Sequence, residues 1–188
     1  DCRFGRDGLG ALEALGERRG FTVQAIDTVL EGGLPVSAAR VREALGAGEV
    51  EAAARLLGRP YAVCGEVVRG KALGRTVGMP TANLEPEPGK LLPAHGVYAT
   101  RVALGGRDYV GVTHLGQRPS VDDEARVSVE TLILDFSGSL YGCRLRLDFL
   151  AFLRPVLRLE GIEAVRRQVA LDAERARELA SSLPSFLR

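Results

Sequence analysis

The sequence predicts a mainly β protein, in which a small antiparallel barrel follows a partial α/β segment and precedes a C-terminal helix. Between residues 61 and 153, apolar residues alternate with polar ones in several short stretches, with no helical period between them. Glycine-rich turns join neighbouring stretches, as at Gly105-Gly106. Beyond residue 161 the apolar residues recur every three or four positions, which is typical of a helix with one buried face.

The first 58 residues are expected to be α/β. Three leucines share one face of a predicted helix that ends at Gly20, and residues 21–26 form a short candidate strand. Ser37 is placed to cap the next helix. A second short helix follows from about residue 49 to residue 57, with Gly58 as its C-terminal cap. These elements form the C-terminal part of an α/β domain in this interpretation.

Residues 59–188 are expected to form the barrel and the helix, with the domain boundary at Gly58-Arg59-Pro60, where helical period gives way to alternation. The candidate strands cover residues 61–69, 96–104, 107–114, 126–136 and 143–153. The last of them carries a period-two apolar face of Leu145, Leu147, Phe149, Ala151 and Leu153. The helix carries its apolar face on Ile162, Val165, Val169, Ala173, Ala176 and Leu179.

The composition argues against several classes of function. The 188 residues are 46% hydrophobic and 26% charged, with a formal net charge of +1, so no overall field recruits nucleic acid or an anionic membrane. No apolar run approaches the roughly 20 residues of a membrane span, and no signal-peptide pattern is present, so a cytoplasmic protein is expected. Because Asp1 stands in place of an initiator Met, a fragment or a processed product is expected.

The cysteines and histidines are few and scattered. Cys2, Cys64 and Cys143 are isolated from one another, which predicts free thiols rather than a zinc site or a disulfide framework. Two histidines, His95 and His114, argue against a multi-histidine metal site and against a Ser-His-Asp hydrolase. Packing or hydrogen bonding is the expected role of both.

A glycine-rich basic segment, GKALGRTVGMPTAN, runs from Gly70 to Asn83. Glycines let backbone N–H groups approach phosphate oxygens closely, and the segment is neither a Walker loop nor a dinucleotide fingerprint. An ordinary surface turn is the alternative on composition alone. The candidate phosphate contacts are Gly70, Lys71, Gly74, Arg75, Thr76, Gly78, Thr81 and Asn83.

Thr81 and Asn83 close this segment and are candidate metal ligands. In an extended chain their side chains point the same way, and they offer a hydroxyl and a carboxamide oxygen of the kind that Mg²⁺ accepts. Both are neutral, so nucleotide phosphates would supply most of the negative charge. The alternative is that the two residues merely close a turn.

Glu130 is an acidic residue within an apolar stretch that includes Val129 and Leu132. An ionisable group there is costly unless it is satisfied, so Glu130 is a candidate catalytic carboxylate. An outward-facing glutamate on an edge strand is the alternative.

Several motifs in order resemble the riboflavin kinase family, especially the kinase half of bacterial bifunctional riboflavin kinase/FAD synthetases. They are LLGRPY (56–61), GEVVRGKALGRTVGMPTAN (65–83), HGVYATRV (95–102), GVTHLGQRPSV (111–121), VSVETLILDF (127–136) and LYG (140–142). The resemblance implies a six-stranded Greek-key barrel with a C-terminal helix. It also implies transfer of the ATP γ-phosphate to the ribityl 5′-hydroxyl of riboflavin, giving FMN and ADP.

The resemblance also implies roles for individual residues. Thr81 and Asn83 would contact Mg²⁺, or Zn²⁺, and the phosphates, while residues 70–78 would cover the nucleotide phosphates. Glu130 would be the general base on the ribityl hydroxyl. Arg118 and Arg154 would flank the flavin, with a surface ion pair as the alternative for each.

Residues 1–58 resemble the C-terminal part of the FMN adenylyltransferase domain of the same enzymes. Ala38 and Ala39 stand where the Ser-Ser-Thr-x-Ile-Arg motif has hydroxyls, and no His-x-Gly-His motif occurs. The chain by itself is therefore expected to make no FAD, and residues 1–58 are expected to dock on the barrel or on another chain.

Two other functions remain open. The first is a non-catalytic flavin- or nucleotide-binding barrel, which would have no need of Glu130. The second is a nucleic-acid-binding barrel, against which the near-neutral charge and the scarcity of aromatic residues argue. The expected partners are therefore the small molecules riboflavin and ATP, with neither nucleic acid nor membrane.

Overall fold

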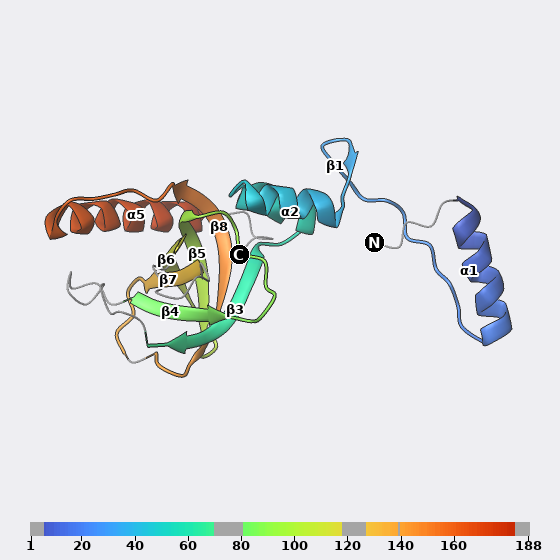
Figure 1. Ribbon diagram of the computed structural model, residues 1–188, viewed down its shortest axis with the longest axis horizontal. Helices are drawn as coiled ribbons and strands as arrows, with labels where there is room; N and C mark the ends of the chain where they lie inside the picture. The colour runs from blue at the N-terminus through green and yellow to red at the C-terminus, as the bar shows by residue number, and fades with distance from the viewer. Residues whose placement is uncertain (1–5, 70–80, 118–126, 139, 183–188) are drawn as a thin grey trace.

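The computed structural model describes residues 6–69, 81–117, 127–138 and 140–182. Six of its strands close into a barrel (Figure 1). In chain order they are β3 Tyr61–Val68, β4 Thr81–Pro86, β5 Gly96–Leu104, β6 Arg107–Gln117, β7 Val127–Ile133 and β8 Arg144–Arg154. The order around the barrel is β3-β4-β7-β6-β5-β8, and every pairing is antiparallel. Because β5, β6 and β7 are consecutive and β8 returns beside β5, the connection is a Greek key. The predicted barrel is confirmed.

The barrel strands lie close to the predicted stretches, but two elements differ from the prediction. β4 is a full barrel strand, paired to β3 on one side and to β7 on the other, where the sequence indicated only an extended segment or a turn. The strand predicted at residues 21–26 is wrong, because these residues form neither helix nor strand. An extended segment needs a partner for its backbone hydrogen bonds, and no described strand pairs with it.

The apolar face predicted for β8 divides between two cores. Leu145, Leu147 and Phe149 point into the barrel, whereas Ala151 and Leu153 belong to a second cluster on its outside. The cause is a shift of register against β5, which pairs Thr100 with Phe149 but Ala99 with Ala151, and so reverses the alternation. One strand thereby contributes to both cores.

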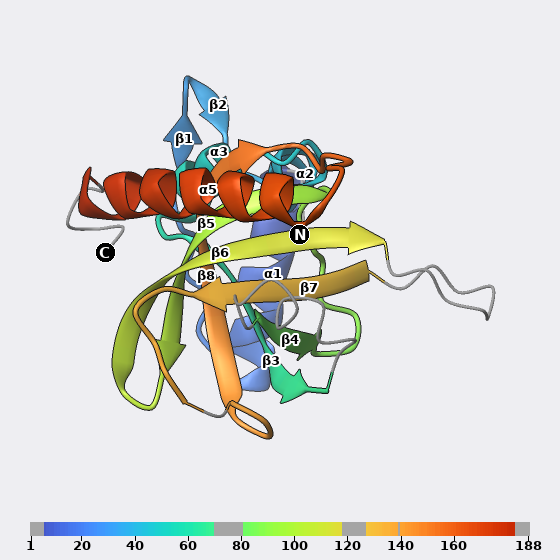
Figure 2. The ribbon, with the colours of Figure 1, turned by 90° about the vertical axis from the view of Figure 1, so that its left-hand side faces the viewer.

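Helix α5, Ile162–Ser182, covers the outside of β5, β6 and β8 (Figure 2). Its buried Ala173 and Ala176 pack with Val97, Ala99 and Val112 of the barrel's outer surface. The helix confirms the predicted C-terminal element. It also hides an apolar part of the barrel wall that would otherwise face solvent.

A short helical pair caps one end of the barrel. Helix α2, Ala38–Gly46, begins at Ser37, whose side chain accepts a hydrogen bond from Arg40 N as predicted for a cap. Helix α3, Val50–Leu57, ends at Gly58 in the left-handed conformation with φ 68°. Ala44, Leu45, Val50 and Ala53 share the barrel's core cluster, so this part of residues 1–58 docks on the barrel. The boundary at Gly58-Arg59-Pro60 stays a prediction.

The remaining N-terminal elements lie away from the barrel. Helix α1, Arg6–Arg19, stands apart at the end of an extended connection (Figure 1). A two-stranded ladder, β1 Leu30–Glu31 and β2 Leu34–Pro35, precedes α2. Among the described residues, no helix has both the length and the apolar character to cross a lipid bilayer.

Candidate active site

Asn83 and Glu130 meet on the outer face of the barrel, where β4 pairs with β7. The ladder places them directly opposite each other as Cα partners. Their neighbours Ala82, Leu84 and Val129 all point into the core, so the alternation of the strands turns Asn83 and Glu130 outward together. Asn83 is nevertheless 8% exposed, whereas Glu130 is half-buried. Thr81 lies two residues earlier in β4 and therefore on the same face.

His114 extends this row to the next strand, because it is the Cα partner of Glu130 across β6 and β7. Its ring lies over Gly116, where a Cβ atom would come within 3.0 Å of the imidazole Nε2. Burial lowers the pKa of His114 below 6.5; Glu130 opposes this shift, while Arg154 and His95 add to it. The imidazole is therefore predominantly neutral at pH 7 and lies within electrostatic reach of the Glu130 carboxylate.

Arg154 stands near the same row but is held by α5. Its Nε donates to both carboxylate oxygens of Asp172, and its Nη2 donates to Asp172 Oδ2 at 2.7 Å. Gln168 donates to Asp172 as well. Arg154 therefore forms an ion pair, but a largely buried one rather than the surface pair considered as the alternative, with the two side chains 18% and 5% exposed.

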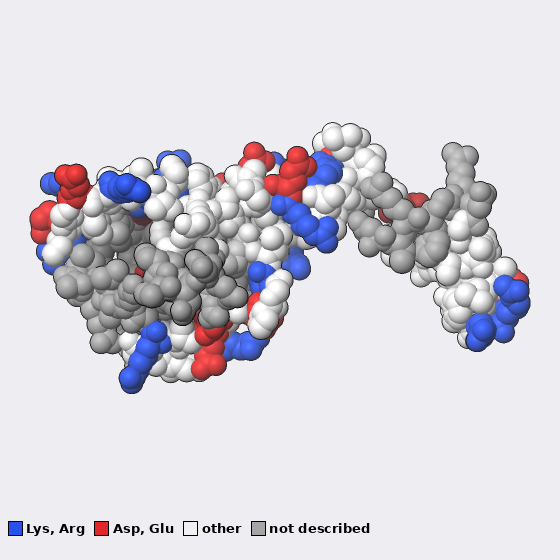
Figure 3. All heavy atoms as spheres, in the orientation of Figure 1, with Lys and Arg blue, Asp and Glu red and all other residues white. Residues whose placement is uncertain are grey.

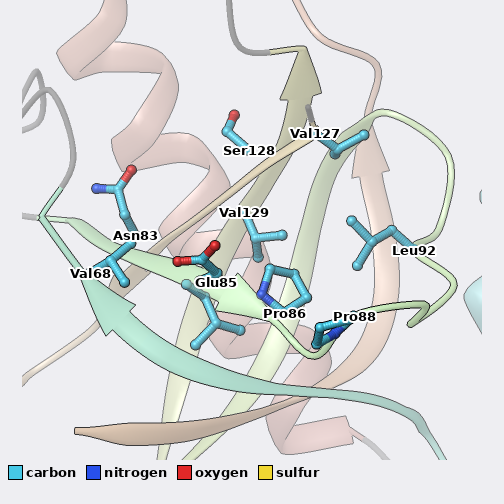
Figure 4. Close-up of a pocket in the computed structure, with 10 residues that line it drawn as sticks. Val68, Asn83, Glu85, Pro86, Pro88, Leu92, Val127, Ser128 and Val129 are labelled. Carbon is cyan, nitrogen blue, oxygen red and sulfur yellow. The ribbon is translucent and has the colours of Figure 1, made fainter. Parts of the chain in front are cut away.

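A hollow opens beside Asn83, where β4 and β7 separate after the Leu84–Val129 pair. Its volume is about 520 Å³, and its walls are mainly apolar. Asn83 lies at one end of the lining residues and Pro88 and Leu92 at the other (Figure 4). A second hollow of about 720 Å³ shares Leu92 and Val127 with the first and extends to His95 and Gly46.

Among the described residues on the face seen in Figure 3, basic and acidic side chains are intermixed.

Comparison with known proteins decides the family. A family model described as Flavokinase, Riboflavin kinase, matches residues 57–180. The chain belongs to the riboflavin kinase family. This confirms the resemblance found in the motifs.

Two relatives in the family extend the match beyond the barrel. The bifunctional riboflavin kinase/FMN adenylyltransferase of Pseudomonas fluorescens is 39% identical over 184 residues, which cover 96% of this chain and 59% of that protein. The enzyme of the same name from Escherichia coli (strain K12) is 37% identical over 182 residues, 95% of this chain and 58% of that protein. The chain thus spans less than two thirds of the length of these curated relatives.

A solved structure supports the fold over the same range. The crystal structure of a macrolide-efflux protein from Streptococcus pneumoniae has a TM-score of 0.81 at 31% identity. The match covers 94% of this chain and 58% of that chain, so it includes the helical pair α2–α3 as well as the riboflavin kinase barrel.

The family's divalent metal would find suitable donors in this chain. Among the described residues, no group of three or more His, Cys, Asp or Glu side chains gathers at one place. The donors near Asn83 are instead its own carboxamide and the Thr81 hydroxyl, which are neutral, hard oxygen ligands. Such a pair fits a cation that arrives with nucleotide phosphates, because the phosphates carry the compensating charge.

The structure brings together only part of the predicted site of this riboflavin kinase family member. Thr81, Asn83 and Glu130 share one face of β4 and β7, and Arg154 lies within electrostatic reach of His114. The other predicted contacts lie outside the described residues: Gly70, Lys71, Gly74, Arg75, Thr76, Gly78 and Arg118.

Sequence reasoning missed His114, Ser128 and Asp172. His114 and Ser128 are neighbours of Glu130 and the hollow only through strand register, which composition does not reveal. Asp172 had a weak signal, since it falls beside Ala173 and Ala176 on the buried side of a predicted helix, where an aspartate needs a partner.

Proposed function

We propose that this chain is a riboflavin kinase that transfers the γ-phosphoryl group of ATP to the ribityl 5′-hydroxyl of riboflavin, giving FMN and ADP. One observation supports this above all: the ladder makes Asn83 and Glu130 direct cross-strand partners on one face. A phosphate-side ligand and a carboxylate base are thereby placed side by side on neighbouring strands. Phosphoryl transfer depends mainly on such positioning and on charge neutralisation.

Glu130 acts in this proposal on the hydroxyl of riboflavin. As the ribityl oxygen forms its bond to the γ-phosphorus, the O–H proton passes to the Glu130 carboxylate and the bond to the ADP oxygen breaks. Glu130 suits this task because it is half-buried, and its cross-strand neighbour on β6 is the imidazole of His114, whose pKa burial lowers, rather than a permanent cation.

Thr81 and Asn83 act on the phosphate side. They would hold Mg²⁺, with Zn²⁺ as the second candidate, together with the β- and γ-phosphates. When bound, the cation supplies positive charge to the transferring group. Residues 70–78 would cover the phosphates, and Arg118 and Arg154 would flank the flavin, as the family resemblance implies.

The hollow beside Asn83 is proposed to receive the nucleoside part of ATP. It begins at Asn83, the phosphate-side residue, and does not include Glu130, the residue assigned to riboflavin. Its apolar walls suit a planar base, which gains from burial against Pro86, Leu92 and Val129.

The kinase unit of residues 59–188 is proposed to work without FAD synthesis by this chain. Helix α2 begins with Ser37, Ala38 and Ala39, of which only Ser37 has a hydroxyl, and that hydroxyl accepts from Arg40 N as the cap. At positions 38 and 39, the start of α2 thus lacks the hydroxyl donors that would meet a nucleotide phosphate. The cytoplasmic location stays a prediction from the composition.

The deciding experiment is direct. The chain is incubated with riboflavin, ATP and Mg²⁺, then with Zn²⁺ or Mn²⁺, and the flavins are separated by chromatography. We expect FMN and ADP in equal amounts and, in a parallel reaction with FMN and ATP, no FAD. Failure to form FMN with any of the metals would contradict the proposal, and flavin or nucleotide binding without FMN would identify a binding module.

A further inference from the structure

The connection between β4 and β5 forms a wall of both hollows. Pro88 and Leu92 line the hollow beside Asn83, and the second hollow is lined by Gly89, Lys90, Leu91, Leu92, Pro93, Ala94 and His95. These residues, 87–95, form neither helix nor strand and are called the wall loop below. Because the loop has no ladder of its own, its position depends on the contacts that it makes with other elements.

The first half of the wall loop is attached to the barrel. Tyr61 Oη donates a hydrogen bond of 2.7 Å to the carbonyl of Leu91, and Lys90 Nζ lies 4.4 Å from the centre of the Tyr61 ring. Glu87 forms an ion pair with Arg144 of β8. This half is therefore fixed by strands β3 and β8, which lie within the matched family segment.

The second half of the wall loop is attached to the helical pair. Ala94 N–H donates to the carbonyl of Leu45 at 2.9 Å, in the last turn of α2, and the same carbonyl accepts from Gly48 N–H at 3.1 Å. Tyr98 Oη donates to the Ala94 carbonyl at 2.6 Å. Burial, followed by the charge of Glu51 on α3, raises the pKa of Tyr98 to about 12, so this hydroxyl stays a donor across the physiological range.

The turn between α2 and α3 is shaped to allow this attachment. Gly48 has φ +80°, and a Cβ atom there would lie 3.2 Å from Tyr98 Oη and 3.5 Å from Ala94 Cβ. The two helices are held in position by the core that they share with Tyr98, in which Leu45, Val50 and Ala53 are at most 1% exposed. Gly46 also lines the second hollow.

We propose that the helical pair α2–α3 is a positioning element of the nucleotide hollow. The pair fixes the wall loop at Ala94, two residues after Leu92, which lines that hollow, through the Leu45 carbonyl and the Gly48 turn, next to the Tyr98 hydroxyl of β5. Nearly all of this pair lies before the family segment, which begins at residue 57. The inference rests on the proposed function in assigning the hollow to ATP. Its consequence is that nucleotide affinity, and not the rate of phosphoryl transfer, depends on these contacts.

The test uses the full chain with Tyr98→Phe, which removes the hydroxyl but keeps the ring that packs edge-on against Phe149 and Phe152. The dissociation constant of Mg·ADP is measured by calorimetry without riboflavin, alongside steady-state kinetics. Loss of one hydrogen bond predicts a rise of about three- to tenfold in that constant and in the KM for ATP, with kcat and the KM for riboflavin unchanged.

Two further variants make the result specific. Tyr109→Phe removes a hydroxyl from β6, whose Tyr109 ring packs on Phe136 and lines neither hollow, and is expected to bind Mg·ADP like the wild type. Gly48→Ala leaves every hydroxyl in place but crowds Tyr98 Oη, and is expected to weaken binding as Tyr98→Phe does.

Each outcome bears on the inference. Unchanged Mg·ADP binding in both Tyr98→Phe and Gly48→Ala would overturn it, as would a fall in kcat with the KM for ATP unchanged. Unfolding of both variants would also overturn it, because the contact would then be a requirement for folding. If the wild type forms no FMN while the variants still weaken Mg·ADP binding, the proposed function fails and the positioning role stands.

Discussion

Glu130 has a different kind of neighbour on each side. Asn83 faces it from β4 with a neutral amide, and His114 faces it from β6 with an imidazole whose pKa burial lowers. Neither neighbour is a permanent cation that would hold the carboxylate in a salt bridge. Among the described cross-strand neighbours, none therefore occupies the carboxylate as a structural ion pair would, which suits the role of a base.

Replacing Glu130 by Gln tests its role as the base. The amide keeps the size and the outward direction of the side chain but accepts no proton. We expect kcat to fall by about 10²- to 10⁴-fold, the usual contribution of a positioned base, with Mg·ADP binding unchanged. Stopped-flow or steady-state FMN formation measures kcat, and calorimetry measures the dissociation constant of Mg·ADP. Wild-type turnover in this variant would place the base elsewhere.

His114 predicts a pH dependence of stability. Its folded-state pKa lies below the unfolded value of 6.5, chiefly because of burial. At a pH between these two pKa values, the unfolded chain binds the proton and the folded chain does not. The contribution of His114 to the free energy of unfolding is therefore fully present above pH 6.5 and is lost as the pH falls. We expect urea midpoints to drop more steeply between pH 7.5 and pH 5.5 in the wild type than in His114→Gln. Parallel pH profiles would contradict this.

The chemistry of the site could be predicted at this scale, but its geometry could not. Thr81, Asn83 and Glu130 were found from residue type and motif. Their meeting depends on a cross-strand register, which is set by turn lengths and packing of the whole barrel rather than by any local pattern. The same limit explains why the sequence predicts no more than a packing or hydrogen-bonding role for His114.

Three threonines join the middle strands of the barrel from the inside. Thr100, Thr113 and Thr131 are all 0% exposed and linked Oγ1 to Oγ1 at 2.8 Å in each step. Thr113 donates to Thr131, which donates to the carbonyl of Val112, so Thr113 has no proton left and Thr100 must be the donor to it. The chain of hydroxyls thus runs in one direction, directly behind Glu130 and His114.

The direction of this chain gives a stability prediction. Thr113→Val leaves the Thr100 hydroxyl without its acceptor, and we expect a loss of about 1–3 kcal/mol in the free energy of unfolding. Thr100→Val leaves only an unused lone pair on Thr113, so its cost should be clearly smaller. Urea denaturation of the two valine variants compares them directly. Equal costs would show that the hydroxyls are not ordered in this direction.

At the scale of elements, the period of apolar residues predicted most strands. It did not predict strand β4 or the register shift in β8. The glycine caps and the alternating stretches were local signals, and they located α2, α3, β5 and β6 well. β4 was not recognised as a strand because Pro80 and a glycine-rich segment precede it, while its pairing partners β3 and β7 are distant in sequence. The register shift at β8 likewise arises from closure of the barrel, which local sequence does not encode.

In the molecule as a whole, α1 and the barrel are joined by a segment with few attachments. Residues 21–28 have no helix or strand, whereas the ladder after them is tied to α2. Arg40 donates to the carbonyls of Glu31, Leu34 and Pro35. The ladder that begins at about residue 29 is therefore anchored to α2.

Limited proteolysis tests this division. We expect thermolysin, which favours apolar residues, to cleave first near Phe21, Val23 or Ile26, of which Phe21 and Ile26 are 46% and 87% exposed. The remaining fragment should keep its thermal transition and its FMN formation. Mass spectrometry identifies the cut, and first cleavage within the described barrel strands would contradict the division.

The fold class of the whole molecule was predictable because three independent signals agreed: alternation, glycine turns and a terminal helical period. The arrangement of the N-terminal part was not, because a partial α/β pattern indicates elements without indicating what they pack against. Among the described N-terminal elements, only α2 and α3 contribute residues to the core around Tyr98 and Phe149.

The seam between β4 and β7 has a consequence for motion. Within the described residues, β4 pairs with β7 from Thr81 to Leu84 and with β3 over an equally short ladder, whereas β5 and β6 pair from Gly96 to Leu104. The barrel should open most readily at the two short ladders of β4, and opening of the one with β7 would carry Asn83 away from Glu130. A nucleotide that contacts both strands would hold them together. The rate of amide hydrogen exchange at Ala82 and Leu84 would then report how often Asn83 and Glu130 lie side by side.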